Sequence, residues 1–141
     1  MGKRIVCSLL VIFIICTQSA CGRKFTDFES EFMDQYYKII QNVNSKEVDD
    51  ILLKLQSKEN ADILGKMDKI LQDNKKMRKV NEKKYDKLKE LYMGLVDLKV
   101  AYKKWESYDL DKQQYLNLQL SDMWAYLSML KHDKKEKSTS K

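Results

Sequence analysis

Apolar residues recur at intervals of three and four along most of the chain after residue 24, which predicts amphipathic helices. The pattern predicts a first helix with an aromatic stripe, ending within residues 42–45, and then a short second helix. The first stripe comprises Phe25, Phe28, Phe32, Tyr36, Ile39 and Val43, and the second comprises Val48, Ile51, Leu52 and Leu55. We expect both stripes to face a core, because side chains of this kind are usually buried.

A longer run of the same spacing covers residues 63–105. Its alternating steps of four and three are typical of a helix that packs one seam against partner helices. The middle of this seam is polar, at Asn74, Asn81 and Lys84. The helix therefore either projects past its partners there or breaks within residues 72–76. We expect one continuous helix, because no glycine or proline lies in that middle to supply a kink.

A last helix is predicted beyond residue 110, and short polar residues mark the predicted helix starts. Its stripe comprises Leu116, Leu120, Met123, Trp124, Leu127 and Leu130. The predicted N-caps are Thr26 with Glu29, Ser45, Asn60, and Asp111 with Gln114. We expect Trp105 and Trp124 to meet and to pin the last helix against the long one, since indoles bury large apolar areas. The charged and hydroxylic residues 132–141 predict a disordered basic tail.

Composition supports this pattern and fixes the fold class. The chain has 141 residues, no proline, four glycines, and neither Asn-Gly nor Asp-Gly, so the usual signals of tight β-hairpins are missing. We therefore predict an all-α fold. The predicted architecture is an elongated antiparallel helical bundle of three to four helices with one long heptad-patterned helix, forming a single domain over residues 26–131.

The first twenty residues have the pattern of a secretory signal peptide. Lys3 and Arg4 precede an apolar run over residues 5–16, and a small, polar stretch follows. The run is shorter than the roughly twenty residues that a membrane-spanning helix needs. We therefore predict that residues 1–20 direct export and are removed.

The end of this leader, Ser19-Ala20-Cys21, resembles the lipobox of bacterial lipoproteins. The resemblance implies that Cys21 receives a diacylglyceryl group and becomes the new N-terminus. Residues 21–25 would then be a lipidated tether that holds the domain at the cell membrane or outer membrane, on its extracytoplasmic side. The alternative is ordinary signal cleavage, which would release a secreted protein.

Residues that could carry chemistry are few, and we expect neither an enzyme nor a cofactor. Cys7 and Cys16 lie in the leader, so the exported chain cannot form an internal disulfide. The single His132 has no neighbouring ligand set in the sequence, so no metal site is predicted. The adjacent carboxylates Asp49 and Asp50 fall at a helix start, where they offset the helix dipole.

The most suggestive candidate site is a basic segment in the middle of the long seam. Its candidate anion-binding residues are Lys75, Lys76, Arg78, Lys79, Lys83 and Lys87. They predict either contact with a polyanionic envelope or host partner, including lipid headgroups, or simply a solvated helix face with acidic neighbours at helical spacing. Nucleic acid is a poor partner for an exported chain.

Two functions are consistent with these features. The first is a membrane-anchored, non-catalytic module at the bacterial envelope that binds a protein or polyanionic partner. The second is a structural spacer that self-associates through its heptad seam as a coiled-coil homo-oligomer.

Overall fold

The computed structural model of the protein describes the backbone of residues 25–139 and the side chains of residues 25–132. Within this range the chain is helical and contains no strand, which confirms the predicted all-α class. The elements are the N-terminal helix over residues 25–42, α2 (Val48–Lys54), α3 (Lys58–Asp73), η1 (Lys75–Lys79), α4 (Glu82–Val100), η2 (Trp105–Ser107) and α5 (Leu110–Thr139). The predicted leader and Cys21 lie outside the described residues.

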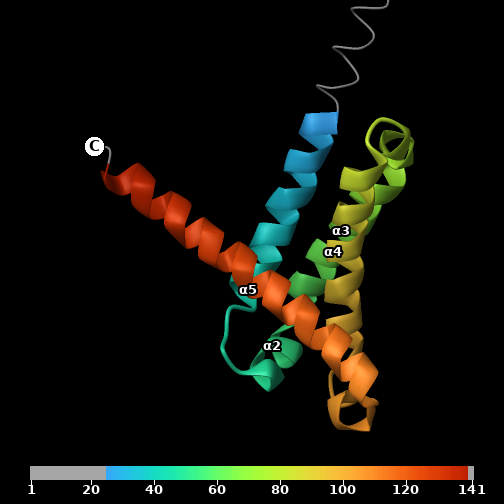
Figure 1. Cartoon of the computed structure of the whole chain (residues 1–141), viewed down its shortest axis with the longest axis vertical. Helices are drawn as coiled ribbons and strands as arrows, with labels where there is room; N and C mark the ends of the chain where they lie inside the picture. Colours follow the sequence, from blue (N-terminus) through green and yellow to red (C-terminus); the bar gives the residue numbers. More distant parts are fainter. Residues whose placement is uncertain (1–24, 140–141) are drawn as a thin grey trace, which may run out of the picture.

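The N-terminal helix, α3 and α4 lie alongside one another, and α5 crosses them at a steep angle (Figure 1). One core joins all of these helices, and the predicted aromatic stripe faces it. Its largest fully buried side chains are Phe32, Ile39, Ile40, Ile51, Leu52, Leu55, Met67, Leu98, Leu116, Leu120, Met123 and Val43. The crossing of α4 and α5 is close at Gly94, where a Cβ atom would overlap the side-chain amide of the buried Gln119.

The expected continuous helix over residues 63–105 is wrong. The chain breaks within the stretch that the alternative named, and the first turn, residues 74–81, reverses its direction between α3 and α4 (Figure 1). The side-chain amide of Asn74 donates to the Ile70 carbonyl at 2.9 Å and closes α3. Met77 is buried under the turn, and Asn81 caps α4 by accepting from the Lys84 amide at 3.1 Å. Polar and flexible side chains thus reverse the chain without glycine or proline.

The second turn, residues 101–109, connects α4 to α5. Ala101 is fully buried, and Lys103 adopts a φ of 59°, in the left-handed region that non-glycine residues seldom occupy. The side-chain amide of Gln113 donates to the carbonyls of Trp105 and Tyr108, both at 3.1 Å. These bonds tie the turn to the first residues of α5.

The two tryptophans do not form the expected joint. Trp105 lies half-buried in η2, at the second turn. Trp124 is 38% exposed, and its indole nitrogen donates to the Ser45 carbonyl at 3.1 Å. Met123 and Leu127, on either side of Trp124 along α5, are buried, so the indole lies at the edge of the buried stripe.

The predicted N-caps are each displaced from the observed ones. Phe25 is already helical, so Thr26 lies inside its helix, while Asn60 and Asp111 lie inside α3 and α5. Ser45 lies three residues before α2 begins, and its hydroxyl accepts from the Glu47 amide. The observed caps are Ser57, which accepts from the Asn60 amide, Asn81, and Asp109, which accepts from the Lys112 amide. Each helix start offers several short polar residues, and only packing selects among them.

Helix α5 also continues to Thr139, where the sequence predicted a disordered tail from residue 132. This extension contains Lys134, Lys135, Glu136 and Lys137 and lacks glycine and proline, which favours helix. Among the described residues, no helix combines the length and the apolarity needed to cross a membrane.

Candidate binding surfaces

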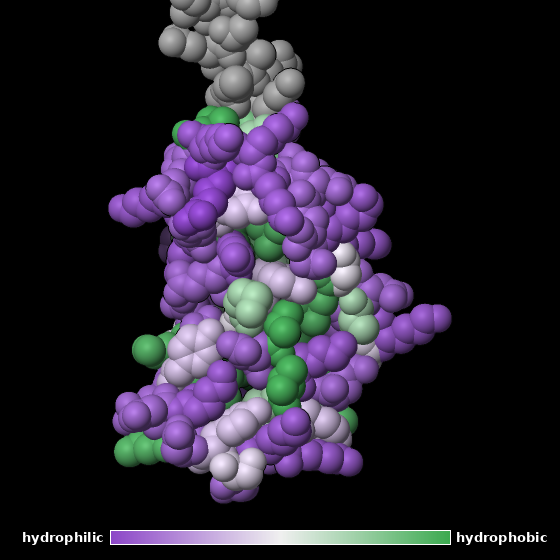
Figure 2. Space-filling view, turned by 90° about the vertical axis from the view of Figure 1, so that its right-hand side faces the viewer, coloured by the Kyte–Doolittle hydropathy of each residue, from purple (hydrophilic) through white to green (hydrophobic). Residues whose placement is uncertain are grey.

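The first turn and the start of α4 form a cationic end of the molecule, which we call the basic tip. Between residues 75 and 89 the sequence has eight lysines and arginines against two carboxylates. The basic side chains are exposed, whereas Met77, Tyr85 and Leu88 are buried beneath them. Figure 2 shows that the face seen from the α3–α4 side is hydrophilic at this end.

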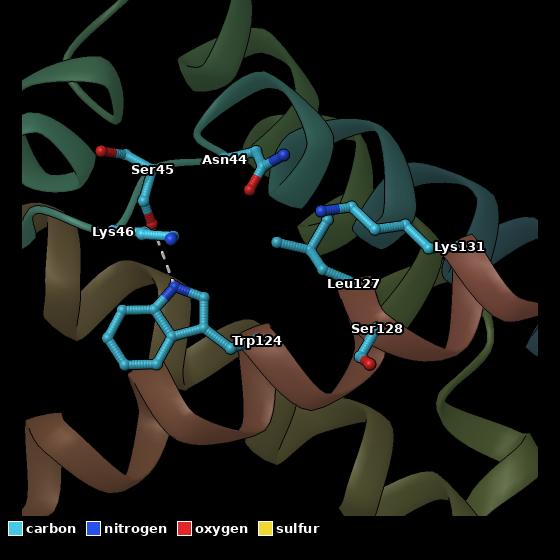
Figure 3. Close-up of a pocket in the computed structure, with 7 residues that line it drawn as sticks. All are labelled: Asn44, Ser45, Lys46, Trp124, Leu127, Ser128 and Lys131. Atoms are coloured by element: carbon cyan, nitrogen blue, oxygen red, sulfur yellow. Dashed lines mark hydrogen bonds between the residues drawn. The ribbon is translucent and has the colours of Figure 1, made fainter.

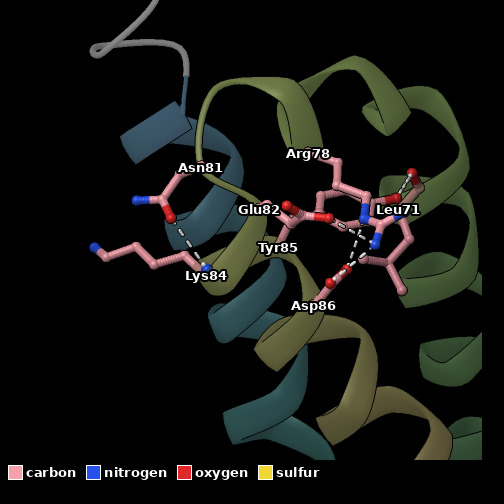
Figure 4. Close-up of polar contacts among 7 residues, drawn as sticks. All are labelled: Leu71, Arg78, Asn81, Glu82, Lys84, Tyr85 and Asp86. Atoms are coloured by element: carbon pink, nitrogen blue, oxygen red, sulfur yellow. Dashed lines mark hydrogen bonds and ion pairs between the residues drawn. The ribbon is translucent and has the colours of Figure 1, made fainter.

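Ion pairs occupy two of the six predicted anion-binding residues. Arg78 binds Asp86 through two bonds of 2.9 and 3.1 Å and also pairs with Glu82 at 2.9 Å (Figure 4). The hydrogen bond from Arg78 to Asp86, with both carboxylates nearby, raises the pKa of the guanidinium. Lys87 pairs with Glu90 at 3.3 Å and with Asp122 at 3.5 Å. Arg78 therefore connects η1 to α4, and Lys87 connects α4 to α5.

The other four predicted residues stay available. Lys75, Lys76, Lys79 and Lys83 are exposed and form no ion pair with any described side chain. The basic segment is thus divided between the two interpretations that the sequence left open. Arg78 and Lys87 belong to a solvated, salt-bridged face, and the four lysines present uncompensated charge.

The basic tip is attached to the start of the N-terminal helix. Lys84 pairs with Glu29 at 3.1 Å, and the Phe28 and Tyr85 rings stack with centroids 5.7 Å apart. The Tyr85 hydroxyl donates to the Leu71 carbonyl at 2.9 Å, and burial raises its pKa. These contacts fix the first turn beside the point where the described chain begins, and both lie at the same end of the molecule (Figure 1).

A second surface surrounds Trp124. A cavity of about 370 Å³ opens between α5 and the connection that follows the N-terminal helix (Figure 3). It is lined by Asn44, Ser45, Lys46, Trp124, Leu127, Ser128 and Lys131. The bond from the indole to the Ser45 carbonyl spans the two walls and holds the ring in place. A smaller cavity of about 190 Å³ shares Asn44, Leu127 and Lys131 with it. Together they form one groove, which we call the Trp124 groove.

The chemistry of the Trp124 groove is apolar and cationic. Trp124 and Leu127 supply an apolar floor, whereas Lys46 and Lys131 supply positive charge, and none of the described lining residues carries a carboxylate. Neither lysine forms an ion pair with a described side chain. The groove is therefore suited to a ligand with an apolar part and a negative charge.

A tyrosine cluster supports the groove from within. Tyr126 packs edge-on against Tyr36 at 5.3 Å and against Tyr37 at 6.3 Å between ring centroids. Burial raises the pKa of the Tyr36 hydroxyl far above its usual value, and Tyr126 and Asp122 add to this effect. These contacts hold α5 against the N-terminal helix and so fix the spacing between the walls of the groove.

The remaining candidate residues for catalysis or metal binding are Asp49, Asp50 and His132. Asp49 and Asp50 lie in the first turn of α2, as predicted. Asp50 binds Lys54 at 2.7 Å, and hydrogen bonds from Lys54 and Ser45 lower the pKa of its carboxyl group, which opposes a role as a proton donor. His132 is exposed on α5. Within residues 25–132, no cluster of three or more potential ligands could hold a metal ion.

Comparison with protein-family models, with curated proteins and with solved structures found no match for this chain. The geometry and charge of the two surfaces must therefore carry any functional argument. The sequence indicated the basic tip, and the structure adds that Arg78 and Lys87 form ion pairs there. It did not indicate the Trp124 groove, because Asn44, Ser45 and Lys46 come from a connection and only the fold brings them to α5.

Proposed function

We propose that this protein is a lipid-anchored, non-catalytic binding module of the bacterial envelope. The lipobox-like leader supports the anchor, at the cell membrane or the outer membrane. The exposed indole of Trp124, fixed by its bond to Ser45 in a groove whose described lining has two lysines and no carboxylate, is the observation that carries the binding role. Exposed tryptophans surrounded by defined walls are common anchors of protein interfaces.

The partner of the Trp124 groove is an acidic segment of another envelope protein. The two cavities share Asn44, Leu127 and Lys131, so together they offer room for a peptide segment. An apolar side chain of the partner stacks on the indole, and a carboxylate lies between Lys46 and Lys131. Such charge pairing sets the orientation and the association rate more than the affinity.

The second function, a self-associating coiled-coil spacer, has less support. It requires a free heptad seam, and the seam residues of α3 and α4 are buried within the chain. Examples are Met67, Leu91 and Leu98. The first turn also interrupts the seam.

Charge reversal tests the groove. The double variant Lys46→Glu, Lys131→Glu should lose capture of the partner from envelope extract, because both walls would then repel an acidic segment. The matched control, Lys38→Glu with Lys104→Glu, reverses two exposed charges outside the groove and should keep capture. Each exposed change should alter the free energy of unfolding by about 0.5 kcal/mol or less. Equal capture by both variants would exclude the groove as the binding surface.

Fluorescence connects the captured partner to Trp124 itself. The variant Trp105→Phe leaves Trp124 as the single tryptophan of the exported chain. Adding the partner should shift its emission to shorter wavelength, because the 38% exposed indole becomes desolvated. An unchanged spectrum on saturating binding would mean that the partner binds elsewhere.

Phase partitioning tests the anchor. The wild-type protein should enter the detergent phase, and Cys21→Ser should move it to the aqueous phase, because the only proposed acyl acceptor is lost. A wild-type protein that is already aqueous would favour ordinary secretion.

A further inference from the structure

We infer that the basic tip docks on the surface of a membrane that contains anionic phospholipid, and so orients the domain on the bilayer. This inference rests on the proposed lipid anchor for its geometry. The lysines Lys75, Lys76, Lys79 and Lys83 carry the contact, and Val80 is the apolar residue among them. Arg78 is excluded because its guanidinium is already committed to Asp86 and Glu82.

The position of the tip relative to the chain entry supports this contact. Phe28 stacks on Tyr85, and Glu29 binds Lys84, so the tip lies beside the first described residues. Phe25 is only four residue steps along the chain from Cys21, and such a segment can span at most about 14 Å when fully extended. An acyl group on Cys21 would therefore hold the tip within reach of the lipid headgroups.

The composition of the tip fits a bilayer surface. Four exposed lysines lack an ion-pair partner among the described side chains, and anionic headgroups attract each such charge. Val80 is 45% exposed at the turn between η1 and α4, with Lys79 before it. Long lysine side chains can reach the headgroups while an apolar neighbour enters the interface. A soluble polyanion would use the same lysines but would leave Val80 without an apolar environment.

A fluorescent label at position 80 tests the contact in the exported, acylated protein. The variant Val80→Cys carries one free thiol, because Cys21 is blocked and the other cysteines leave with the leader. An environment-sensitive dye on this thiol should shift to shorter wavelength on vesicles of phosphatidylcholine mixed with phosphatidylglycerol. It should not shift on phosphatidylcholine alone, where only the anchor holds the protein. The same dye at Leu118→Cys, which is exposed on α5, should not shift on either.

A matched pair of variants tests whether the lysines of the basic tip cause the shift in dye emission. Replacing Lys75, Lys79 and Lys83 by glutamine in the labelled protein should abolish the shift. Replacing Lys38, Lys58 and Lys104 by glutamine removes the same charge from exposed positions elsewhere and should keep it. The inference is overturned if the vesicle-bound protein shows no shift on the mixed vesicles. It is also overturned if a sulfated polysaccharide produces the shift and the mixed vesicles do not.

The two proposals can fail separately. A protein that does not remain on phosphatidylcholine vesicles is not acylated, which refutes the anchor. The tip can then still be tested by sedimentation with the mixed vesicles, where the triple tip variant should bind about a hundredfold more weakly, or about fivefold for each lysine. Equal sedimentation of the tip and control variants would overturn the tip as a membrane contact.

Discussion

The two turns that flank α4 reverse or redirect the chain by different means. At the first turn, side-chain contacts stabilise the reversal. Asn74 closes α3, Met77 is buried under the turn, and Asn81 caps α4. At the second turn, the backbone itself changes direction, because Lys103 adopts a left-handed conformation. Neither turn contains glycine or proline. The comparison shows that a chain without these residues can turn sharply, either through packing and capping or by accepting local strain.

Removing the side chain beneath the first turn should have the largest effect. Met77→Ala leaves a cavity under the turn and should lower the free energy of unfolding by about 2–5 kcal/mol, measured by urea denaturation. Met93→Ala is the control, because Met93 is 42% exposed and its loss should cost about 0.5 kcal/mol or less. Similar midpoints for both variants would show that packing does not hold this turn.

Removing the cap should have an intermediate effect. Asn81→Ala deletes the acceptor of the Lys84 amide and should cost about 1 kcal/mol in the same experiment. The control Asn117→Ala makes the same chemical change at an exposed site inside α5, where alanine favours helix and should stabilise slightly. The free energy of unfolding should fall for Asn81→Ala and rise slightly for Asn117→Ala. A loss of equal size in both variants would contradict the assigned cap.

Relieving the second turn should change the wild-type stability least, because glycine at position 103 removes the strain at φ but loses more backbone freedom on folding. Lys103→Gly suits the φ of 59°, whereas Lys104→Gly replaces a residue with a φ of −120° that already suits lysine. Lys103→Gly should therefore be more stable than Lys104→Gly by about 1 kcal/mol. Thermal unfolding of the two variants measures this difference, and an equal loss in both would argue against strain at Lys103.

The sequence predicted the faces of the helices better than their lengths and junctions. The stripe at Phe28 and Phe32 is buried as expected, because three-four spacing directly reports one helix face. The same spacing runs through the break at residues 74–81, since α3 and α4 each have their own stripe, and so it could not reveal two helices. Whether a helix ends depends on what its side chains pack against, which a single sequence does not specify.

The candidate sites, too, could be predicted from the sequence only in part, because a single sequence does not specify which side chains meet in the fold. Local charge predicted the basic tip, but only the fold distinguished Arg78, which binds Asp86, from the free charge of Lys79. Trp124 lies on the predicted stripe of α5, but its indole is partly exposed. Met123 and Leu127 are buried, so Trp124 lies at the edge of the stripe, and the width of a helix face that its neighbours cover depends on how the helices pack.

The crossing of α5 has a further consequence for its protection against hydrogen exchange. Leu116, Leu120 and Met123 are buried near the close approach at Gly94, and Leu130 is the last α5 residue that packs against the core. The helix then continues to Thr139 and extends away from the body of the molecule (Figure 1). Beyond Leu130 its backbone amides are held by the helix alone, so they open by fraying, whereas the amides at the crossing open only when the core does. Amide exchange within α5 should therefore be slow at the crossing and fast beyond Leu130, although the helix is continuous.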